Sequence, residues 1–327
     1  MNRVIVTGGN GFIGRNLAKK LLSCKLDSLA LISNTPNIRD KYLSDRKFLN
    51  DKDIPLRFYT ADIRDKKTIS EIFQNEKADT CIHLAAKISV ADSIINPKET
   101  MDINVNGTQN VLEACSNSKL NNFIFASSAA VYGDARELPI SENASMTPLS
   151  PYGKSKMLAE ELVFRYDKLK KVQNTISLRI FNVYGSGNVS QSDVVSKFAA
   201  RVSKGLPPII YGDGNHTRDF ISIDDVADAI LLSIRAMESR DNGNFNSSPV
   251  FNIGSGTSTS INELAHKMIA ISDLDIDPIY EKETQNCGVI LHSYPDILKA
   301  KRVLKFVAKK DLDTGLKELI GTLTSSK

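Results

Sequence analysis

Tyr152 and Lys156 stand four positions apart at the start of an expected helix, in a Y-x-x-x-K spacing. Positions i and i+4 share one helix face, so the ammonium group can lie beside the phenol. A neighbouring cation favours the phenolate and lowers the pKa of a tyrosine toward that of a general base. Tyr166 and Lys170 repeat the spacing, but Tyr166 falls on the apolar side of the helix and is assigned to packing. Tyr152 is therefore the candidate base.

Ser128 offers a hydroxyl at the end of the apolar run 122–127. Ligands of open α/β sheets bind at the carboxyl ends of the strands, which is where this residue falls. A hydroxyl there can pass a proton between a substrate and Tyr152. The alternative is that Ser128 only satisfies backbone groups where the strand ends.

Gly8, Gly11 and Gly14 form a G-x-x-G-x-x-G pattern between an expected strand at residues 3–7 and an expected helix at residues 12–24. Gly8 permits a tight turn, Gly11 lets the backbone approach a pyrophosphate, and Gly14 allows the helix to pack closely on the strand. The free N–H groups of the helix N-terminus favour an anion. The pattern predicts a dinucleotide site, and a glycine turn without a ligand is the alternative.

The end of the second expected strand lacks an acid that dinucleotide sites usually carry. About 20 residues after the glycines, such an acid binds the adenosine ribose diol. Here that place falls on Ser33 and Asn34. Ser33 cannot repel a 2′-phosphate, and Arg39 is a candidate partner for one, so the residues leave both NAD and NADP open.

The chain alternates strand and helix patterns that would bring these residues to one edge of a sheet. Short apolar runs predict six buried strands, at residues 3–7, 28–33, 56–59, 81–86, 122–128 and 175–180. Helical spacing predicts helices at residues 12–24, 65–76, 97–118 and 151–171. The last would have Ser150 as N-cap, Pro151 as first residue, and an apolar stripe of Leu158, Leu162, Tyr166 and Leu169. Repeated β-α units imply an α/β protein with a Rossmann-type, doubly wound parallel sheet.

Beyond residue 181 the pattern changes, because Gly, Pro and Asn become frequent and strands no longer alternate cleanly with helices. We expect a dinucleotide-binding domain at residues 1–180, to which the chain returns around residues 217–253. Residues 181–327 would mainly form a smaller α/β substrate-binding lobe at the C-terminal side. Within it, Ser260 and Glu263 are spaced as a capping box that opens a late helix.

The composition excludes several classes of function. The 327 residues carry 42 Lys and Arg against 38 Asp and Glu, a net charge of +4, and the interleaved charges indicate no nucleic-acid surface. The four cysteines form no C-x-x-C and the four histidines no H-E-x-x-H, which argues against a metal. No apolar run is long enough for a membrane span, and no signal-peptide pattern is present. Scattered cysteines fit a reducing cytoplasm.

The glycines, the serine and the Tyr–Lys pair, in this order on these elements, resemble the extended short-chain dehydrogenase/reductase family and, within it, the nucleotide-sugar epimerases. The resemblance covers nearly the whole chain. The matching segments are residues 7–14, 62–63, 84–87, 104–108, 179–185, 211–214 and 217–221.

The resemblance implies roles for these residues. Ser128, Tyr152 and Lys156 would be catalytic, and Lys156 would also hold the nicotinamide ribose. Ser128 would also contact the substrate, Asn182 would bind the sugar diphosphate, and Arg218 would bind a diphosphate through its guanidinium fork. The implied cofactor-binding residues are Gly8, Gly11, Phe12, Ile13, Gly14, Ser33, Asn34, Asp62, Ile63, Leu84, Ala85, Ala86, Lys87, Asn104, Tyr152, Lys156 and Phe181, the last on the nicotinamide side.

Two departures distinguish this chain within the family. Dehydratases carry Thr-Asp-Glu where this chain has Ser128, Ala129 and Ala130, and neither alanine can supply the acid and base that removal of water needs. Epimerases usually carry Arg-x-Gly-Asp where residues 286–289 read Asn-Cys-Gly-Val. The missing cation and carboxylate bear on how the nucleotide half of the substrate is bound.

The resemblance therefore implies an NAD-dependent epimerase that acts at C4 of a nucleotide-activated hexose through a 4-keto intermediate. A keto-sugar reductase or small-alcohol dehydrogenase on the same scaffold is the alternative, favoured by Ser33 and residues 286–289. A non-enzymatic nucleotide-binding module is a further alternative, against which Ser128, Tyr152 and Lys156 argue. The resemblance to this family favours NAD over NADP as the cofactor. The resemblance also implies a homodimer, paired through helices at about residues 97–118 and 151–170, while the composition predicts a cytoplasmic protein with no nucleic-acid, membrane or metal partner.

Overall fold

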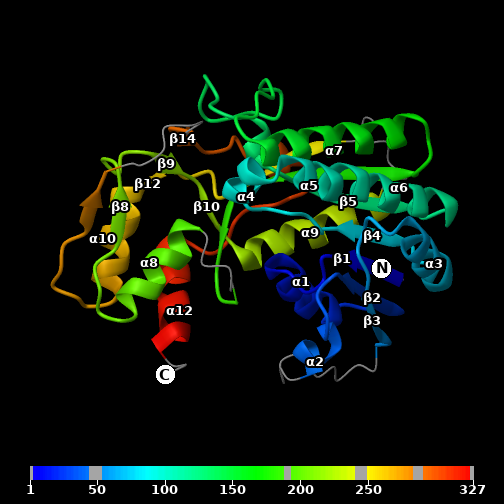
Figure 1. Ribbon diagram of the computed structural model, residues 1–327, viewed down its shortest axis with the longest axis horizontal. Helices are drawn as coiled ribbons and strands as arrows, with labels where there is room; N and C mark the ends of the chain where they lie inside the picture. Colours follow the sequence, from blue (N-terminus) through cyan, green and yellow to red (C-terminus); the bar gives the residue numbers. More distant parts are fainter. Residues whose placement is uncertain (1–2, 44–53, 188–192, 240–248, 283–289, 325–327) are drawn as a thin grey trace.

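Seven parallel strands form the central sheet of the computed structural model, which describes residues 3–43, 54–187, 193–239, 249–282 and 290–324 (Figure 1). The strands are β1 (Arg3–Thr7), β2 (Ser28–Ser33), β3 (Leu56–Thr60), β4 (Thr80–His83), β5 (Asn122–Ser128), β6 (Asn174–Ile180) and β11 (Val250–Ile253). Their order across the sheet is β11-β6-β5-β4-β1-β2-β3. The order reverses between β1 and β4, so the carboxyl ends of these two strands border the crevice where such sheets bind ligands.

The sheet confirms the α/β class and the Rossmann-type architecture expected from the sequence. All six expected strands are present, although β4 ends at His83 and residues 84–87 form a loop. The seventh strand, β11, comes from a distant part of the chain and pairs with β6, with Ile253 opposite Ile180. A domain boundary at residue 180, with residues 181–327 as the substrate lobe, stays a prediction.

Helices cover both faces of this sheet, because successive strand residues point to opposite sides. Val4 and Val6 pack on one side against helices α1 (Phe12–Leu22), α2 (Ile38–Leu43), α9 (Ile223–Glu238) and α11 (Leu298–Val303). Ile5 packs on the other side, against α3 (Lys66–Glu76), α6 (Gly107–Asn117) and α7 (Pro151–Lys168). The two cores hold the strands rigidly beneath the crevice.

The long helix expected at residues 97–118 is not a continuous α-helix. It consists of α5 (Pro97–Met101), a π-helical turn η2 (Asp102–Asn106) and α6, and a short helix α4 (Val90–Ile95) precedes it. Asn104 lies in the π-turn with its side chain buried, and Thr108 donates a hydrogen bond to the Asn104 carbonyl at 2.6 Å. Single π-turns inside helices often mark functional sites.

Helix α7 begins as expected but buries a different face. Ser150 accepts a hydrogen bond from the Gly153 N–H at 3.1 Å and so caps the helix. The expected apolar stripe is wrong in part: Tyr166 is buried, Leu158 and Leu162 are only half-buried, and Leu169 is 58% exposed. The buried face instead carries the polar residues Ser155, Lys156, Glu160 and Asp167 beside Ala159 and Val163. Helical periodicity of apolar residues cannot reveal polar groups that pair inside the fold.

A smaller lobe lies beside the sheet, on the left of Figure 1. Its helices α8 (Val194–Val202), α10 (Ile261–Ile271) and α12 (Leu312–Thr324) enclose a third apolar core. Ser260 caps α10 by accepting the Glu263 N–H at 3.0 Å, as the capping box predicts. Its short strands are β7 (Asn182–Tyr184), β8 (Ile209–Tyr211), β9 (Thr217–Arg218), β10 (Phe220–Ser222), β12 (Thr259–Ser260), β13 (Ile279–Glu281) and β14 (His292–Ser293).

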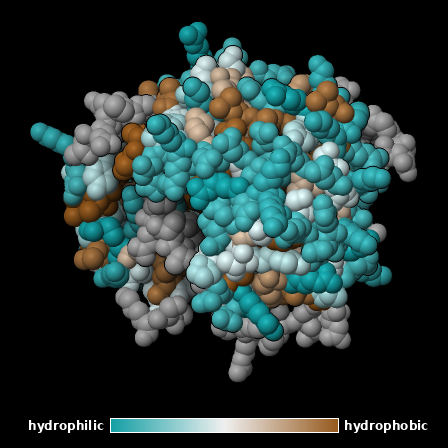
Figure 2. Space-filling view, turned by 45° about the vertical axis from the view of Figure 1, so that its right-hand side comes forward, coloured by the Kyte–Doolittle hydropathy of each residue, from teal (hydrophilic) through white to brown (hydrophobic). Residues whose placement is uncertain are grey.

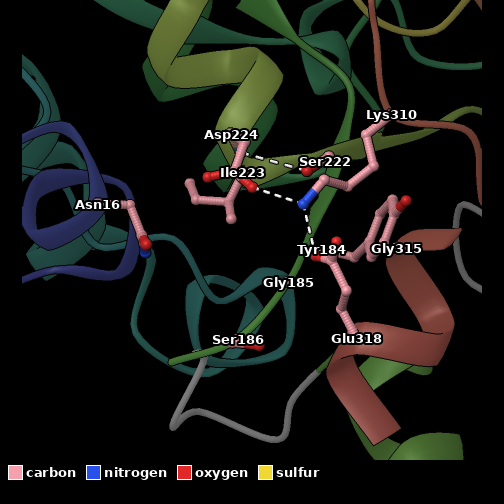
Figure 3. Close-up of a pocket in the computed structure, with 10 residues that line it drawn as sticks. All are labelled: Asn16, Tyr184, Gly185, Ser186, Ser222, Ile223, Asp224, Lys310, Gly315 and Glu318. Atoms are coloured by element: carbon pink, nitrogen blue, oxygen red, sulfur yellow. Dashed lines mark hydrogen bonds and ion pairs between the residues drawn. The ribbon is translucent and has the colours of Figure 1, made fainter. Parts of the chain in front are cut away.

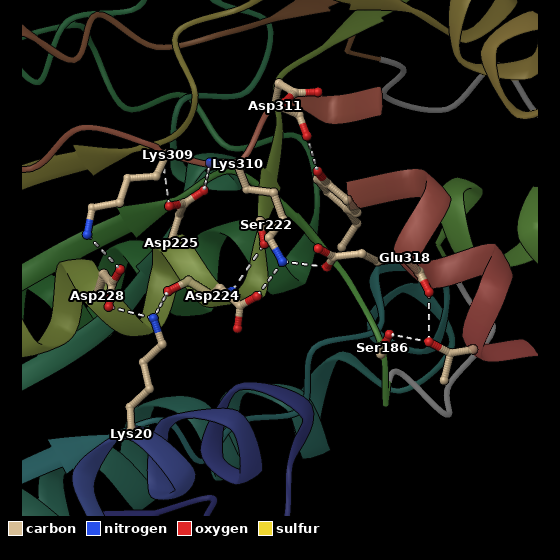
Figure 4. Close-up of polar contacts among 12 residues, drawn as sticks. Lys20, Ser186, Ser222, Asp224, Asp225, Asp228, Lys309, Lys310, Asp311 and Glu318 are labelled. Carbon is tan, nitrogen blue, oxygen red and sulfur yellow. Dashed lines mark hydrogen bonds and ion pairs between the residues drawn. The ribbon is translucent and has the colours of Figure 1, made fainter. Parts of the chain in front are cut away.

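Polar contacts join the start of α9 to the segment that leads into α12 (Figure 4). The buried carboxylate of Asp225 accepts the backbone N–H groups of Lys309 at 2.9 Å and Lys310 at 3.1 Å. The Lys310 ammonium lies 2.7 Å from Asp224 and 2.5 Å from Glu318 of α12. This junction fixes the smaller lobe against the helix that supports β5 and β6.

Hydrophilic side chains cover most of the face seen in Figure 2, with hydrophobic ones in separate groups. Over the described ranges, no helix combines the length and the apolar character that crossing a membrane requires. On and beside α4, Ile88, Ile94 and Ile95 are 61%, 53% and 74% exposed, and Phe164 on α7 is 47% exposed. These apolar residues lie near the helices through which a homodimer is expected to pair.

Candidate active site

The glycine loop connects β1 to α1 in a conformation that only small residues allow. Gly8 has a φ of +72°, and a Cβ atom there would lie 2.7 Å from the Ala85 nitrogen. A Cβ atom on Gly14 would lie 2.3 Å from the Gly8 carbonyl oxygen. Gly11 donates its N–H to the same oxygen at 2.9 Å and serves as N-cap of α1. The loop therefore requires glycine at positions 8 and 14, as the sequence predicted.

This loop is prepared for an anion. Within the described parts of the chain no side chain caps the N-terminus of α1, so its first N–H groups point outward with the positive end of the helix dipole. The Asn10 side-chain oxygen is buried and has no hydrogen-bond partner among the described residues. The Tyr42 hydroxyl donates to the Gly9 carbonyl and fixes the loop from behind. A glycine cradle, a free helix terminus and an orphaned polar atom fit the pyrophosphate of NAD.

The residues expected to bind the adenosine follow the ends of β2 and β3. Ser33 is buried and accepts the Thr35 N–H at 3.2 Å, whereas Asn34 is exposed. Asp62 pairs with Arg64 at 2.7 Å, and this guanidinium lowers the pKa of the carboxyl group. Ile63 packs closely on Gly107 of α6, where a Cβ atom would lie 2.5 Å from the isoleucine. These residues lie on the side of the glycine loop expected for the adenine.

Asn104 ties the loop after β4 to helix α7. Its side-chain oxygen accepts the Lys87 N–H at 2.7 Å, and its amide group donates to the Lys87 carbonyl at 2.9 Å. The same amide group donates to the Ser155 hydroxyl of α7 at 2.8 Å. The half-buried residues 84–86 precede Lys87, whose ammonium pairs with Glu99. The loop is therefore held in place opposite the glycines.

The three expected catalytic residues meet at the carboxyl end of β5. The Ser128 and Tyr152 side chains interact there, and this interaction lowers the pKa of Tyr152 against the larger effect of burial. Lys156, one turn further along α7, is only 4% exposed and donates to the Ala126 carbonyl at 2.8 Å. Burial lowers the pKa of Lys156 to about 7. This arrangement can carry out proton transfer at a hydroxyl group of a bound substrate.

One expectation about these residues is wrong. The sequence predicted a lowered pKa for Tyr152 because Lys156 lies one turn away. In the structure, burial raises the pKa of Tyr152, and the hydrogen bond from Ser128 opposes this shift only in part. Desolvation disfavours the phenolate more strongly than that single hydrogen bond favours it.

The residues expected on the substrate side come from the smaller lobe and its connections. Phe181, expected on the nicotinamide side, comes just before them and is buried beside Tyr132, with the ring centroids 6.5 Å apart. Asn182 is exposed and donates its amide group to the Asp219 carbonyl at 2.9 Å. Arg218 donates to the backbone carbonyl of Thr217 at 2.8 Å, and burial lowers the pKa of its guanidinium. Among the described residues, Arg218 forms no salt bridge with a carboxylate, so its charge is available to an anion.

Two buried carboxylates were not identified from the sequence. Asp219 accepts the backbone N–H groups of Ser255 at 2.9 Å and Gly256 at 2.6 Å, so it positions the segment next to Arg218. Glu160 pairs with Arg179 at 2.5 Å below the catalytic residues. A charged residue within an apolar strand, as Arg179 is, was the available signal. The departure at residues 286–289 lies outside the described residues.

A small polar cavity of about 80 Å³ lies apart from these residues, between α1, α9 and α12 (Figure 3). Asn16, Gly185 and Asp224 are among its lining residues, and the Lys310 ammonium reaches between Asp224 and Glu318. With its charges already paired, this cavity offers no catalytic group, and we place the chemistry at the ends of β1, β4 and β5.

The fold and the glycine loop define a dinucleotide-binding enzyme, and comparisons with known proteins narrow this class. A model of the NAD dependent epimerase/dehydratase family matches residues 4–254. The UDP-glucose 4-epimerase of Lactobacillus helveticus is 30% identical over 324 residues, which are 94% of this chain and 93% of that protein. The crystal structure of the Thermotoga maritima UDP-glucose 4-epimerase with UDP-glucose has a TM-score of 0.87 and 29% identity, covering 100% of this chain and 99% of that one. The Thermus thermophilus enzyme with NAD has a TM-score of 0.84 and 28% identity, covering 100% of both chains.

The chain belongs to the NAD-dependent epimerase/dehydratase family. The expectation of an NAD-dependent nucleotide-sugar epimerase is confirmed, and the alternative of a reductase or dehydrogenase is not favoured. The residue roles assigned from the sequence stay predictions.

Proposed function

We propose that this chain interconverts UDP-glucose and UDP-galactose by inverting C4 through a 4-keto intermediate. The observation that carries the proposal is the meeting of Ser128, Tyr152 and the buried Lys156 at the end of β5, in the same sheet as the strand that leads into the glycine loop. Relatives named as UDP-glucose 4-epimerases support this choice of substrate, as does a structurally similar protein whose crystal structure contains UDP-glucose.

Each residue of the site has a place in this reaction. Tyr152 would take the proton of the C4 hydroxyl group, directly or through Ser128, and return it after the 4-keto sugar has turned over. Lys156 would hold the nicotinamide ribose, while Asn182 and Arg218 would bind the diphosphate. The glycine loop and Asn104 would hold NAD, which when bound would accept the C4 hydride and later return it.

The test is conversion of UDP-galactose to UDP-glucose by the purified chain, followed by chromatography of the nucleotide sugars. We expect conversion in both directions without consumption of added NADH. Net oxidation or reduction of the sugar would contradict an epimerase. If the chain converted only UDP-N-acetylhexosamines, the proposed reaction would hold and the proposed substrate would be wrong.

Cofactor selectivity is expected to be weak. Ser33 carries no charge that would repel a 2′-phosphate, so binding titrations should give NAD and NADP dissociation constants within about tenfold of each other. Ser33→Asp should increase the preference for NAD by roughly tenfold, because a carboxylate repels the phosphate. A hundredfold preference for NAD in the unchanged chain would contradict this role of Ser33.

Loss of the ammonium group of Lys156 should change the pH dependence of epimerisation. The active form of Tyr152 is the phenolate, so activity rises as pH passes the pKa of this residue. Burial raises the pKa of Tyr152, and we expect the Lys156 ammonium to oppose this shift, so in Lys156→Met the rising limb of kcat/KM should move to still higher pH and turnover should slow. If the rising limb of kcat/KM stayed at the same pH in Lys156→Met, Lys156 would not contribute to the activation of Tyr152.

We also propose a cytoplasmic homodimer that acts in carbohydrate metabolism. The family resemblance supports pairing through α5–α6 and α7, and the exposed Ile94, Ile95 and Phe164 lie close to these helices. Analytical ultracentrifugation at micromolar concentration should give twice the chain mass of 36.0 kDa. A species of 36 kDa under these conditions would contradict the dimer.

A further inference from the structure

His83 is the last residue of β4 and is completely buried where the sheet meets the cofactor site. Its Nδ1 atom lies 2.6 Å from the Thr7 hydroxyl oxygen, at the end of β1. Its Nε2 atom lies 2.9 Å from the Thr108 hydroxyl oxygen, at the start of α6. The ring stacks on Phe125 of β5, with 5.9 Å between the ring centroids. A histidine thus links three separate elements at the crevice.

The surrounding hydrogen bonds determine which nitrogen of His83 carries the proton. Thr108 has one hydroxyl proton and donates it to the Asn104 carbonyl at 2.6 Å. Its oxygen must therefore accept from His83, so the proton is on Nε2. Nδ1 is then the acceptor of a hydrogen bond from the Thr7 hydroxyl group. The Thr7 hydroxyl oxygen in turn accepts the Ala85 N–H at 3.3 Å. Each donor in this series of hydrogen bonds therefore has one acceptor.

A charged imidazole would break this order, because it has two donors and no acceptor. Thr7 would then lose the acceptor for its hydroxyl proton. Burial, together with the neighbouring ammonium of Lys156, lowers the pKa of His83 to about 3. The ring therefore stays neutral throughout the physiological pH range.

The chain of hydrogen bonds continues to the catalytic helix. The Asn104 carbonyl accepts the hydrogen bond from the Thr108 hydroxyl group. The Asn104 side chain accepts the Lys87 N–H and donates to the Ser155 hydroxyl group at 2.8 Å. Ser155 donates to the Tyr152 carbonyl at 2.7 Å. One connected set of bonds thus joins the cofactor loop, the π-turn and the residue that carries the catalytic phenol.

We propose that His83 is a positioning residue of the cofactor site, which as the neutral Nε2–H tautomer aligns the loop at residues 84–87 with Asn104 of the π-turn. The inference rests on the assignment of these residues to NAD, and it is independent of which sugar is epimerised. The His83 side chain is completely buried, and both ring nitrogens bond to threonine hydroxyl groups. It acts through Thr7 and Thr108, and its loss would loosen both sides of the crevice.

The test uses Thr108, because its hydroxyl group connects His83 to the Asn104 carbonyl. Valine and serine are close in size to threonine and differ from it in the hydroxyl group or the methyl group alone. Thr108→Val removes the hydroxyl group at nearly equal volume and should weaken NAD binding about tenfold. Thr108→Ser retains the hydroxyl group and should bind NAD within about twofold of the parent. NAD affinity is measured by calorimetry on the full chain, with thermal unfolding of each variant recorded beside it.

Thr80→Val is the matched control. Thr80 lies at the opposite end of β4, is 3% exposed, and accepts a bond from Asn122 at 3.4 Å. This variant should lose some thermal stability and keep its NAD affinity. Unchanged affinity in Thr108→Val, or equal loss in Thr80→Val, would overturn the proposal. Because NAD binding is measured without substrate, failure of epimerisation with any sugar would be recognised separately.

A spectroscopic measurement on the unaltered protein tests the proposal even where a variant does not fold. Nitrogen-15 NMR of labelled histidine distinguishes the two neutral tautomers and the cation. His83 should show the Nε2–H form with no titration between pH 5 and 8. An Nδ1–H ring, or a ring that titrates in this range, would overturn the assignment.

Discussion

Tyr152→Phe should lower the rate of epimerisation by about 10²- to 10⁴-fold, the usual contribution of a positioned acid–base group. The substitution removes the phenolic oxygen that meets Ser128 and keeps the ring. Binding of NAD should persist, because the glycine loop and Lys156 are unchanged. The rate is measured by conversion of UDP-galactose under saturating substrate, and NAD binding by titration.

Tyr166→Phe is the internal control, since it alters the second tyrosine of α7 in the same Y-x-x-x-K spacing. Tyr166 is 7% exposed within the core between α7 and the sheet, and turnover should stay nearly unchanged. If Tyr166→Phe lost activity and Tyr152→Phe kept it, the assignment of the base would be wrong and the mechanism would have to be abandoned.

Glu160→Gln should reduce the free energy of unfolding by about 3 kcal/mol or more. Glu160 and Arg179 are 6% and 4% exposed, and the guanidinium donates to both carboxylate oxygens at 2.5–3.2 Å. Ser127 also donates to this carboxylate at 2.7 Å. Removing the negative charge leaves a buried cation without compensation, which costs far more than an exposed pair contributes. Urea unfolding of both proteins measures the difference.

Glu113→Gln provides the same chemical change at the surface. Glu113 pairs with Lys66 at 2.6 Å, and the lysine side chain is 66% exposed. Solvent screens this pair, so the unfolding free energy should change by no more than about 1 kcal/mol. Equal losses in both variants would show that burial of Glu160 does not set the strength of its ion pair.

Local pattern was sufficient for much of the fold. The six strands found by their apolar runs are all in the sheet, because strands buried on both faces need uninterrupted apolar residues. The glycine loop was also readable, since Gly8 and Gly14 occupy places where a side chain has no room. These features depend on neighbours in the sequence or on one repeated motif.

Other features depend on contacts between distant segments, which no local pattern contains. The π-turn at Asn104 follows from side-chain bonds to Lys87 and Ser155, 17 and 51 residues away. The buried face of α7 carries Lys156 and Glu160, whose partners lie on β5 and β6. The raised pKa of Tyr152 likewise reflects burial by the folded chain, which outweighs the hydrogen bond from Ser128.

The placement of β11 and α12 has a consequence for how this protein forms during synthesis. The edge of the sheet beside β6 stays open until residues 250–253 have left the ribosome, and the third core lacks Leu316, Leu319 and Ile320 until α12 follows. Until then the nascent chain presents an unpaired strand edge and apolar surface, the features that favour aggregation and chaperone binding. The protein therefore completes its third apolar core only after all seven strands of the central sheet have been synthesised.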